Sequence, residues 1–175
     1  MHVKPSKSRA REWLGTVALA FCLGIVLLAT MWPTPLDQDY GAAVEKFLAV
    51  LHRNGIPMWF GYNKLEFSAN IVMFMPLGFL ITLLLSTRAL WLALFICPGL
   101  SIGIELTQAV ALSARFATAT DVIANSTGAL LGIILCVFLR GFVYARDQKL
   151  VARALWDHGV RGENAASAAL ARSAG

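Results

Sequence analysis

Charged side chains are scarce in this chain: only 14% of its 175 residues are Asp, Glu, Lys or Arg, whereas 58% are hydrophobic. About a quarter of the residues in a soluble domain are charged, so this composition excludes an ordinary soluble protein. The net charge of +5 does not indicate nucleic-acid binding, because the basic residues flank apolar runs and form no stripe with interleaved aromatics. We therefore predict an all-α, polytopic membrane protein.

Cysteine and histidine are also few, with three of each. Every cysteine lies inside an apolar run and lacks a partner at the spacing of a metal or redox motif, which indicates small hydrophobic side chains: Cys22, Cys97 and Cys136. The histidines are scattered through polar segments and belong to no metal motif: His2, His52 and His158. No metal site and no cofactor are predicted.

Four apolar runs are long enough to cross a hydrocarbon core of about 30 Å as helices: about 13–32, 68–86, 89–113 and 118–139. The first is longer than the apolar region of a signal peptide and has a poor cleavage site, which predicts an uncleaved span. The sequence thus predicts a four transmembrane helix bundle over residues 13–139. We expect a cytoplasmic N-terminus (1–12) before it and a basic cytoplasmic tail (140–175) after it, amphipathic to about His158 and then Ala-rich and loosely ordered.

The polar segment between the first two runs contains a helical pattern. Its apolar residues recur at helical spacing, and Asn54-Gly55 ends the pattern as a C-cap: Val44, Phe47, Leu48 and Leu51. This predicts one amphipathic extracytoplasmic helix resting on the membrane surface. A helix covering the outer mouth of the bundle is the alternative.

The orientation follows from the basic residues, which are enriched on the cytoplasmic side of a membrane protein. With four spans, one side of the membrane has most of them: Lys4, Lys7, Arg9, Arg11, Arg88, Arg140, Arg146, Lys149 and Arg153. The other side has fewer: Lys46, Arg53, Lys64 and Arg115. Both termini are therefore predicted to be cytoplasmic.

Polar side chains interrupt the last two apolar runs, between Gly103 and Gly132: Glu105, Gln108, Arg115, Asp121 and Asn125. A charge at the centre of a lipid-facing helix costs about 2.5–3.5 kcal/mol, so these groups must be paired, hydrated or turned inward. In the predicted topology they converge with Asn70 in the outer leaflet. Glu105 and Asn125 lie ten residues on either side of Arg115, which predicts that they sit at similar depth.

We interpret this convergence as a pocket for a polar lipid headgroup or a similar small molecule, formed by Asn70, Glu105, Gln108, Arg115, Asp121 and Asn125. One alternative is a structural clasp, in which Arg115 pairs with Asp121 or Glu105 and locks two helices together. Another is an intramembrane enzyme acting on a headgroup, with Glu105 and Asp121 as acid and base. No catalytic residue is assigned, because no Ser/His, Cys/His or metal triad accompanies the carboxylates. A small transporter has little support from four spans without a repeat.

Proline and glycine in the last three apolar runs indicate helix packing. Gly128-x-x-x-Gly132 allows two helices to approach closely. Pro76 and Gly78 lie inside the second run, where Pro76 removes one backbone donor. These residues fit packing and need no catalytic explanation.

The ordered pattern over residues 68–136 resembles the VanZ-like family of bacterial membrane proteins. It consists of Asn70-x3-Phe74-x-Pro76-x-Gly78, Glu105-x2-Gln108, and Arg115-x5-Asp121-x3-Asn125-x2-Gly128-x3-Gly132. The chain departs from this resemblance at Thr118, where many relatives have an acidic residue, and this weakens a mechanism that needs several acids.

The resemblance implies a multi-pass protein of the bacterial cytoplasmic membrane. The family is named for low-level teicoplanin resistance, and its biochemical activity is not established. Membrane lipids are expected partners of the four spans, and the convergence of polar residues suggests a lipid-linked or glycopeptide-like ligand. Homo-oligomer formation is left open.

Overall fold

The computed structural model describes residues 9–31, 36–111 and 118–173, and all regular secondary structure in these ranges is helical. The elements are α1 (Arg9–Thr30), α2 (Leu36–Arg53), α3 (Tyr62–Leu84), the 3-10 helix η1 (Thr87–Leu92), α4 (Ala93–Ala111) and α5 (Ala119–Ser173). The predicted all-α class is confirmed.

Among the described residues, four helical segments are long and apolar enough to cross a membrane: Glu12–Thr30, Tyr62–Leu84, Thr87–Val110 and Ala119–Val160. Large apolar side chains stay exposed around all of them; Val110, for example, is 89% exposed and Phe21 is 71% exposed. A helix that is apolar on every side requires an apolar solvent. The chain is therefore a multi-pass membrane protein, as predicted.

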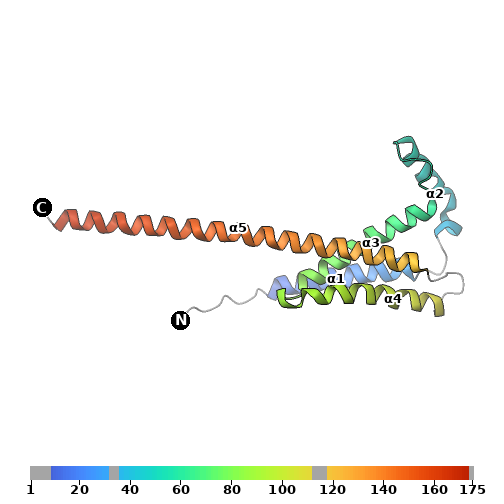
Figure 1. Ribbon diagram of the computed structural model, residues 1–175, viewed down its shortest axis with the longest axis horizontal. Helices are drawn as coiled ribbons and strands as arrows, with labels where there is room; N and C mark the ends of the chain where they lie inside the picture. The colour runs from blue at the N-terminus through green and yellow to red at the C-terminus, as the bar shows by residue number, and fades with distance from the viewer. Residues whose placement is uncertain (1–8, 32–35, 112–117, 174–175) are drawn as a thin grey trace. The chain divides into compact units, whose positions relative to one another are not determined.

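The chain divides into two compact units, residues 1–136 and 137–175. In the first unit, α1 packs against α3 and α4, and the beginning of α5 lies beside α3 and α4 (Figure 1). Its core includes fully buried apolar side chains from these helices, among them Val26, Phe74, Leu77, Cys97 and Ala129. This core holds together the helix ends that position the polar residues.

Helices α3 and α5 approach until their backbones touch. A Cβ atom added to a glycine would overlap the backbone of the facing helix at three places: Gly128 with Ile71, Gly132 with Met75, and Gly78 with Ala129. The first two pairs advance in the same direction along both chains, so α3 and α5 run parallel. Small residues at such a crossing permit the van der Waals contact that drives helix association in membranes.

Helix α2 ends as the sequence predicts, at Asn54-Gly55. The amide of Ile56 donates to the carbonyl of Leu51 (3.1 Å) and the amide of Gly55 donates to that of His52 (3.2 Å). Gly55 has a φ of 95°, a conformation that glycine adopts without strain. This is the Schellman arrangement, which satisfies the last carbonyls of a helix.

Two segments differ from the sequence-based expectations. The third apolar run starts with η1, and its α-helix begins only at Ala93. In the second unit, the expectation of a loosely ordered Ala-rich end is wrong, because α5 remains helical to Ser173. Alanine has the highest helix propensity of all residues, and this part of the chain has no proline.

Candidate functional site

The polar residues are organised around the first turn of α5. The hydroxyl of Thr118 accepts a hydrogen bond from the amide of Asp121 (3.1 Å) and donates one to Oδ2 of the same residue (2.8 Å). Thr118 is therefore the N-cap of α5. In a capping box the side chain at the third helical position would accept from the Thr118 amide; here the Asp121 carboxylate accepts from the Thr118 hydroxyl instead, and the amide donates to Glu105. A carboxylate in this turn is also stabilised by the positive end of the helix dipole.

Asn70 joins this turn to α3. Its Nδ2 donates to Oδ1 of Asp121 at 3.0 Å, so both oxygens of the Asp121 carboxylate accept hydrogen bonds. The contact depends on the parallel packing of α3 and α5, in which Gly128 lies against Ile71, the residue after Asn70. The sequence prediction placed Asn70 and Asp121 near each other, and the structure brings them into direct contact.

Glu105 reaches the same turn from α4. Its side chain is buried, with 6% of the residue exposed, and its Oε2 accepts a hydrogen bond from the amide of Thr118 (3.1 Å). Glu105 and Asp121 therefore contact one residue from two different helices. We call Asn70, Glu105, Thr118 and Asp121 the Thr118 cluster.

Asn125 lies one turn deeper in α5. Its Nδ2 donates to the hydroxyl of Ser101 (3.1 Å), and Asn125 is 2% exposed. The sequence prediction placed Asn125 at the depth of Glu105, but its observed partner is Ser101, one helical turn before Glu105. The prediction placed the turn between the two helices near Arg115, ten residues from both Glu105 and Asn125. In the structure Glu105 instead lies beside Thr118, the residue immediately before α5.

Gln108 makes a contact apart from the Thr118 cluster. Its Nε2 donates to the backbone carbonyl of Thr30 at 2.6 Å, and both residues are 7% exposed. This bond joins α4 to the end of α1, where carbonyls lack partners within the helix. Arg115, the sixth residue of the predicted pocket, lies outside the described residues.

Thr118 is the residue that the sequence reasoning did not include in the site. The sequence contained a signal for it, because Thr-x-x-Asp before an apolar helix is the pattern of a capping box. Thr118 stands where many proteins of the family that the chain resembles have an acidic residue. Its hydroxyl both donates and accepts a hydrogen bond. An ionised carboxylate could only accept.

Thr118→Val is expected to lower the free energy of unfolding by about 1–2 kcal/mol, because it removes the hydroxyl that caps α5. Thr118→Ser should retain most of the stability. Thermal unfolding in detergent micelles measures the difference, with Thr120→Val as a control at an exposed threonine of the same helix. Equal stability of the Val and Ser variants would show that the cap contributes nothing.

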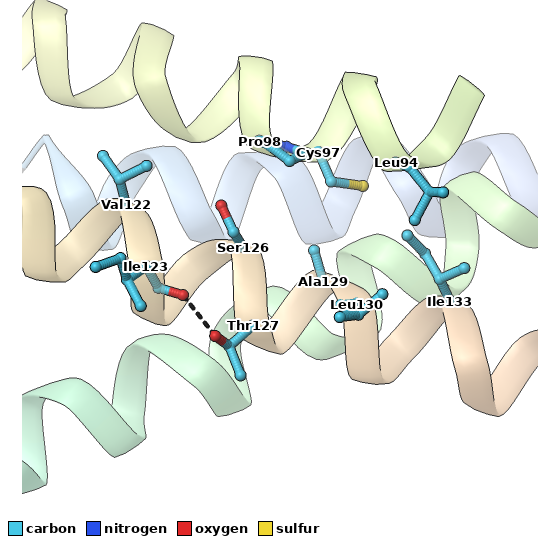
Figure 2. Close-up of a pocket in the computed structure, with 10 residues that line it drawn as sticks. All are labelled: Leu94, Cys97, Pro98, Val122, Ile123, Ser126, Thr127, Ala129, Leu130 and Ile133. Atoms are coloured by element: carbon cyan, nitrogen blue, oxygen red, sulfur yellow. Dashed lines mark hydrogen bonds between the residues drawn. The ribbon is translucent and has the colours of Figure 1, made fainter. Parts of the chain in front are cut away.

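A cavity of about 350 Å³ lies between α4 and α5 (Figure 2). On α5 its lining extends from Val122, the residue after Asp121, to Ile133. Its lining is mainly apolar and includes Leu94, Cys97, Ala129 and Ile133. Two hydroxyl groups border it. That of Thr127 donates to the carbonyl of Ile123 (2.7 Å), whereas the buried Oγ of Ser126 has no hydrogen-bond partner among the described residues.

Comparison with known proteins assigns the chain to a family. The VanZ/LLP1 family model matches residues 16–140, more than two-thirds of the chain and including every residue of the Thr118 cluster. No curated protein and no solved structure matches the chain. This match, together with the four helices among the described residues that are long and apolar enough to span a membrane, shows that the chain is a multi-pass membrane protein of the VanZ/LLP1 family.

Proposed function

We propose that this protein acts in the bacterial cell envelope by binding the polar headgroup of a lipid or lipid-linked molecule at the Thr118 cluster. The observation that supports the proposal is that Glu105 and Asp121, from two helices, both contact Thr118. Ionisable side chains within membrane-spanning helices are costly and usually mark a site of function.

The chemistry of the cluster favours a ligand that donates hydrogen bonds. Ionised carboxylates accept only, and each oxygen accepts more than one bond, so the single bonds to Asn70 and Thr118 leave acceptor positions on Asp121. Both partners of the Asp121 carboxylate, Asn70 and Thr118, are neutral side chains. A ligand with an ammonium group and neighbouring hydroxyls would donate hydrogen bonds to the vacant acceptor positions, and its positive charge would complement the carboxylate.

The predicted topology places the cluster in the outer leaflet of the cytoplasmic membrane, with both termini in the cytoplasm. Asp121 is half-buried and Thr118 is exposed, so a headgroup can approach from the bilayer surface. Glu105 lies behind them and is almost entirely buried. In this arrangement Asp121 contacts the ligand directly, and Glu105 lies deeper in the bundle behind Asp121.

The test compares lipids retained by the purified protein in bilayer discs that contain equal phosphatidylethanolamine and phosphatidylglycerol. Wild-type protein should retain the amine-bearing lipid preferentially. Glu105→Gln and Asp121→Asn should each reduce that preference about tenfold, since hydrogen bonds to a charged group contribute about 1.5–3 kcal/mol. The side-chain oxygen that remains in Glu105→Gln can still accept from the amide of Thr118, so this variant can keep that hydrogen bond. Asp121→Asn keeps one side-chain oxygen and so can accept from Asn70 or from Thr118, but not from both.

Asp147→Asn is the matched control, because Asp147 is an exposed carboxylate in the second unit. It should leave the lipid ratio unchanged.

A purely structural role is the second candidate, since the cluster joins α3, α4 and α5 by hydrogen bonds. Variants at Glu105 and Asp121 that fold normally and retain the wild-type lipid ratio would support this role and contradict headgroup binding.

A further inference from the structure

The cavity between α4 and α5 is unsuited to water. At about 30 Å³ per molecule, 350 Å³ could hold on the order of ten waters, each of which needs two to four polar partners. The lining offers few such partners, because eight of the ten lining residues are apolar and the hydroxyl of Thr127 is bonded within α5. An apolar occupant is therefore favoured.

The cavity is also accessible from the surrounding bilayer. Three lining side chains are largely exposed on the outside of the bundle: Leu94 (49%), Ile123 (58%) and Leu130 (44%). In a membrane, the groups next to these side chains are hydrocarbon chains. A chain can thus enter sideways between the helices and does not have to cross an aqueous surface.

Polarity changes in order along the contact between α4 and α5. On α4, Glu105, Ser101, Cys97 and Leu94 recur every three or four residues and so lie on one face. Glu105 belongs to the Thr118 cluster, Ser101 pairs with Asn125, and Cys97 and Leu94 line the cavity. The interface therefore changes from charged through neutral polar to apolar, as a phospholipid does from its headgroup to its chains.

Ser126 lies between the charged and the apolar parts of the interface between α4 and α5. Its Oγ is buried and has no hydrogen-bond partner among the described residues, and the side chain points from α5 toward Pro98 and Cys97 of α4 (Figure 2). It follows Asp121 by five residues, about 7 Å along the helix axis. An unpaired hydroxyl at this depth can donate to the ester carbonyl of a lipid, and that bond would offset the cost of burying it.

We propose that the α4–α5 cavity binds one fatty-acyl chain of a glycerophospholipid, with the Ser126 hydroxyl donating to its ester carbonyl. This inference rests on the proposed function in one respect, namely that the same lipid places its headgroup at the Thr118 cluster. The chain would lie along Cys97, Ala129 and Ile133 and leave the cavity past Leu94.

The experiment uses cells that incorporate a diazirine-labelled fatty acid into their phospholipids, followed by irradiation, purification and mapping of the cross-linked residues. Cross-links should concentrate on the cavity-lining segments of α4 and α5, above the level on exposed apolar residues such as Phe138 (70%) and Ile102 (47%). Leu94→Trp fills the cavity from its exposed side and should reduce its cross-links about tenfold. Ser126→Ala, which removes only the hydroxyl, should reduce them about threefold.

Ile96→Trp is the matched control, because Ile96 is 44% exposed on the same helix and does not line the cavity. It should leave the pattern unchanged. Equal labelling inside and outside the cavity, or a wild-type yield in Leu94→Trp, would mean bulk lipid contact only and would overturn the inference.

The two proposals fail separately. Cavity cross-links that disappear in Leu94→Trp, in a protein without headgroup preference, would contradict the Thr118 cluster proposal and support the acyl-chain site. A headgroup preference that depends on Glu105, in a protein without cavity cross-links, would do the reverse.

Discussion

Gly132→Ala is expected to lower the free energy of unfolding by about 1–3 kcal/mol, although alanine favours helix formation, because the added methyl group overpacks a closed interface. A Cβ at this position would overlap the backbone of Met75 and lie 2.7 Å from the amide nitrogen of Phe79. Backbone atoms cannot rotate away, so α3 and α5 would have to separate. Gly132→Leu should prevent the native bundle from assembling.

The control is Gly103→Ala on α4, where nothing lies within 4 Å of the added atom. There the substitution should be neutral or stabilise the helix by about 0.5–1 kcal/mol, since only the backbone preference of glycine changes. Thermal unfolding in detergent, followed by the loss of the folded peak in size-exclusion chromatography, measures both. A Gly132→Ala protein as stable as Gly103→Ala would refute close contact between α3 and α5.

Gln108→Glu should destabilise the bundle more than Gln108→Met does. The methionine variant loses the bond to the carbonyl of Thr30 (2.6 Å) and leaves that buried oxygen without this donor, at a cost of about 1–3 kcal/mol. An ionised glutamate loses the same bond, has no proton to donate, and places a buried negative charge beside the carbonyl oxygen. The expected order of unfolding temperature is therefore wild type, then Gln108→Met, then Gln108→Glu.

Thr107→Val is the control for this series. Thr107 precedes Gln108 and is exposed, and its hydroxyl donates to the carbonyl of Gly103 within α4 (2.7 Å). Its replacement should change the free energy of unfolding by less than about 0.5 kcal/mol. If Gln108→Glu unfolds at the same temperature as Gln108→Met, the contact with α1 is not a buried hydrogen bond.

The predicted alternative of a polar clasp pairs Arg115 with Asp121 or Glu105, and Arg115 lies outside the described residues. Other polar side chains do join the described helices. Gln108 and Asn125 each join α4 to another helix through one hydrogen bond, which is how polar side chains hold membrane helices together. The Thr118 cluster differs because it combines two carboxylates with an exposed residue at a helix end. For this reason we assign headgroup binding to the Thr118 cluster and a structural role to Gln108 and Asn125.

The local elements were accessible from the sequence because they depend on neighbouring residues. Apolar runs predict the four spanning helices, since a hydrocarbon core requires a minimum length of apolar helix. Asn54-Gly55 predicts the end of α2, because few residues other than glycine adopt the positive φ that this helix end requires. The helical tail was missed, since its Ala-rich composition was interpreted as a lack of order and not as helix propensity.

By itself, the sequence determined that the protein is helical, that it spans the membrane several times, and which polar residues lie within the spans. Only the tertiary structure decided the partners: Glu105 and Asp121 at Thr118, Asn125 at Ser101, and Gln108 at Thr30. The physical reason is that helical periodicity assigns a residue to a face, whereas the axial register between two helices depends on how their side chains and glycines pack. A shift of one turn changes every partner without changing the pattern in the sequence.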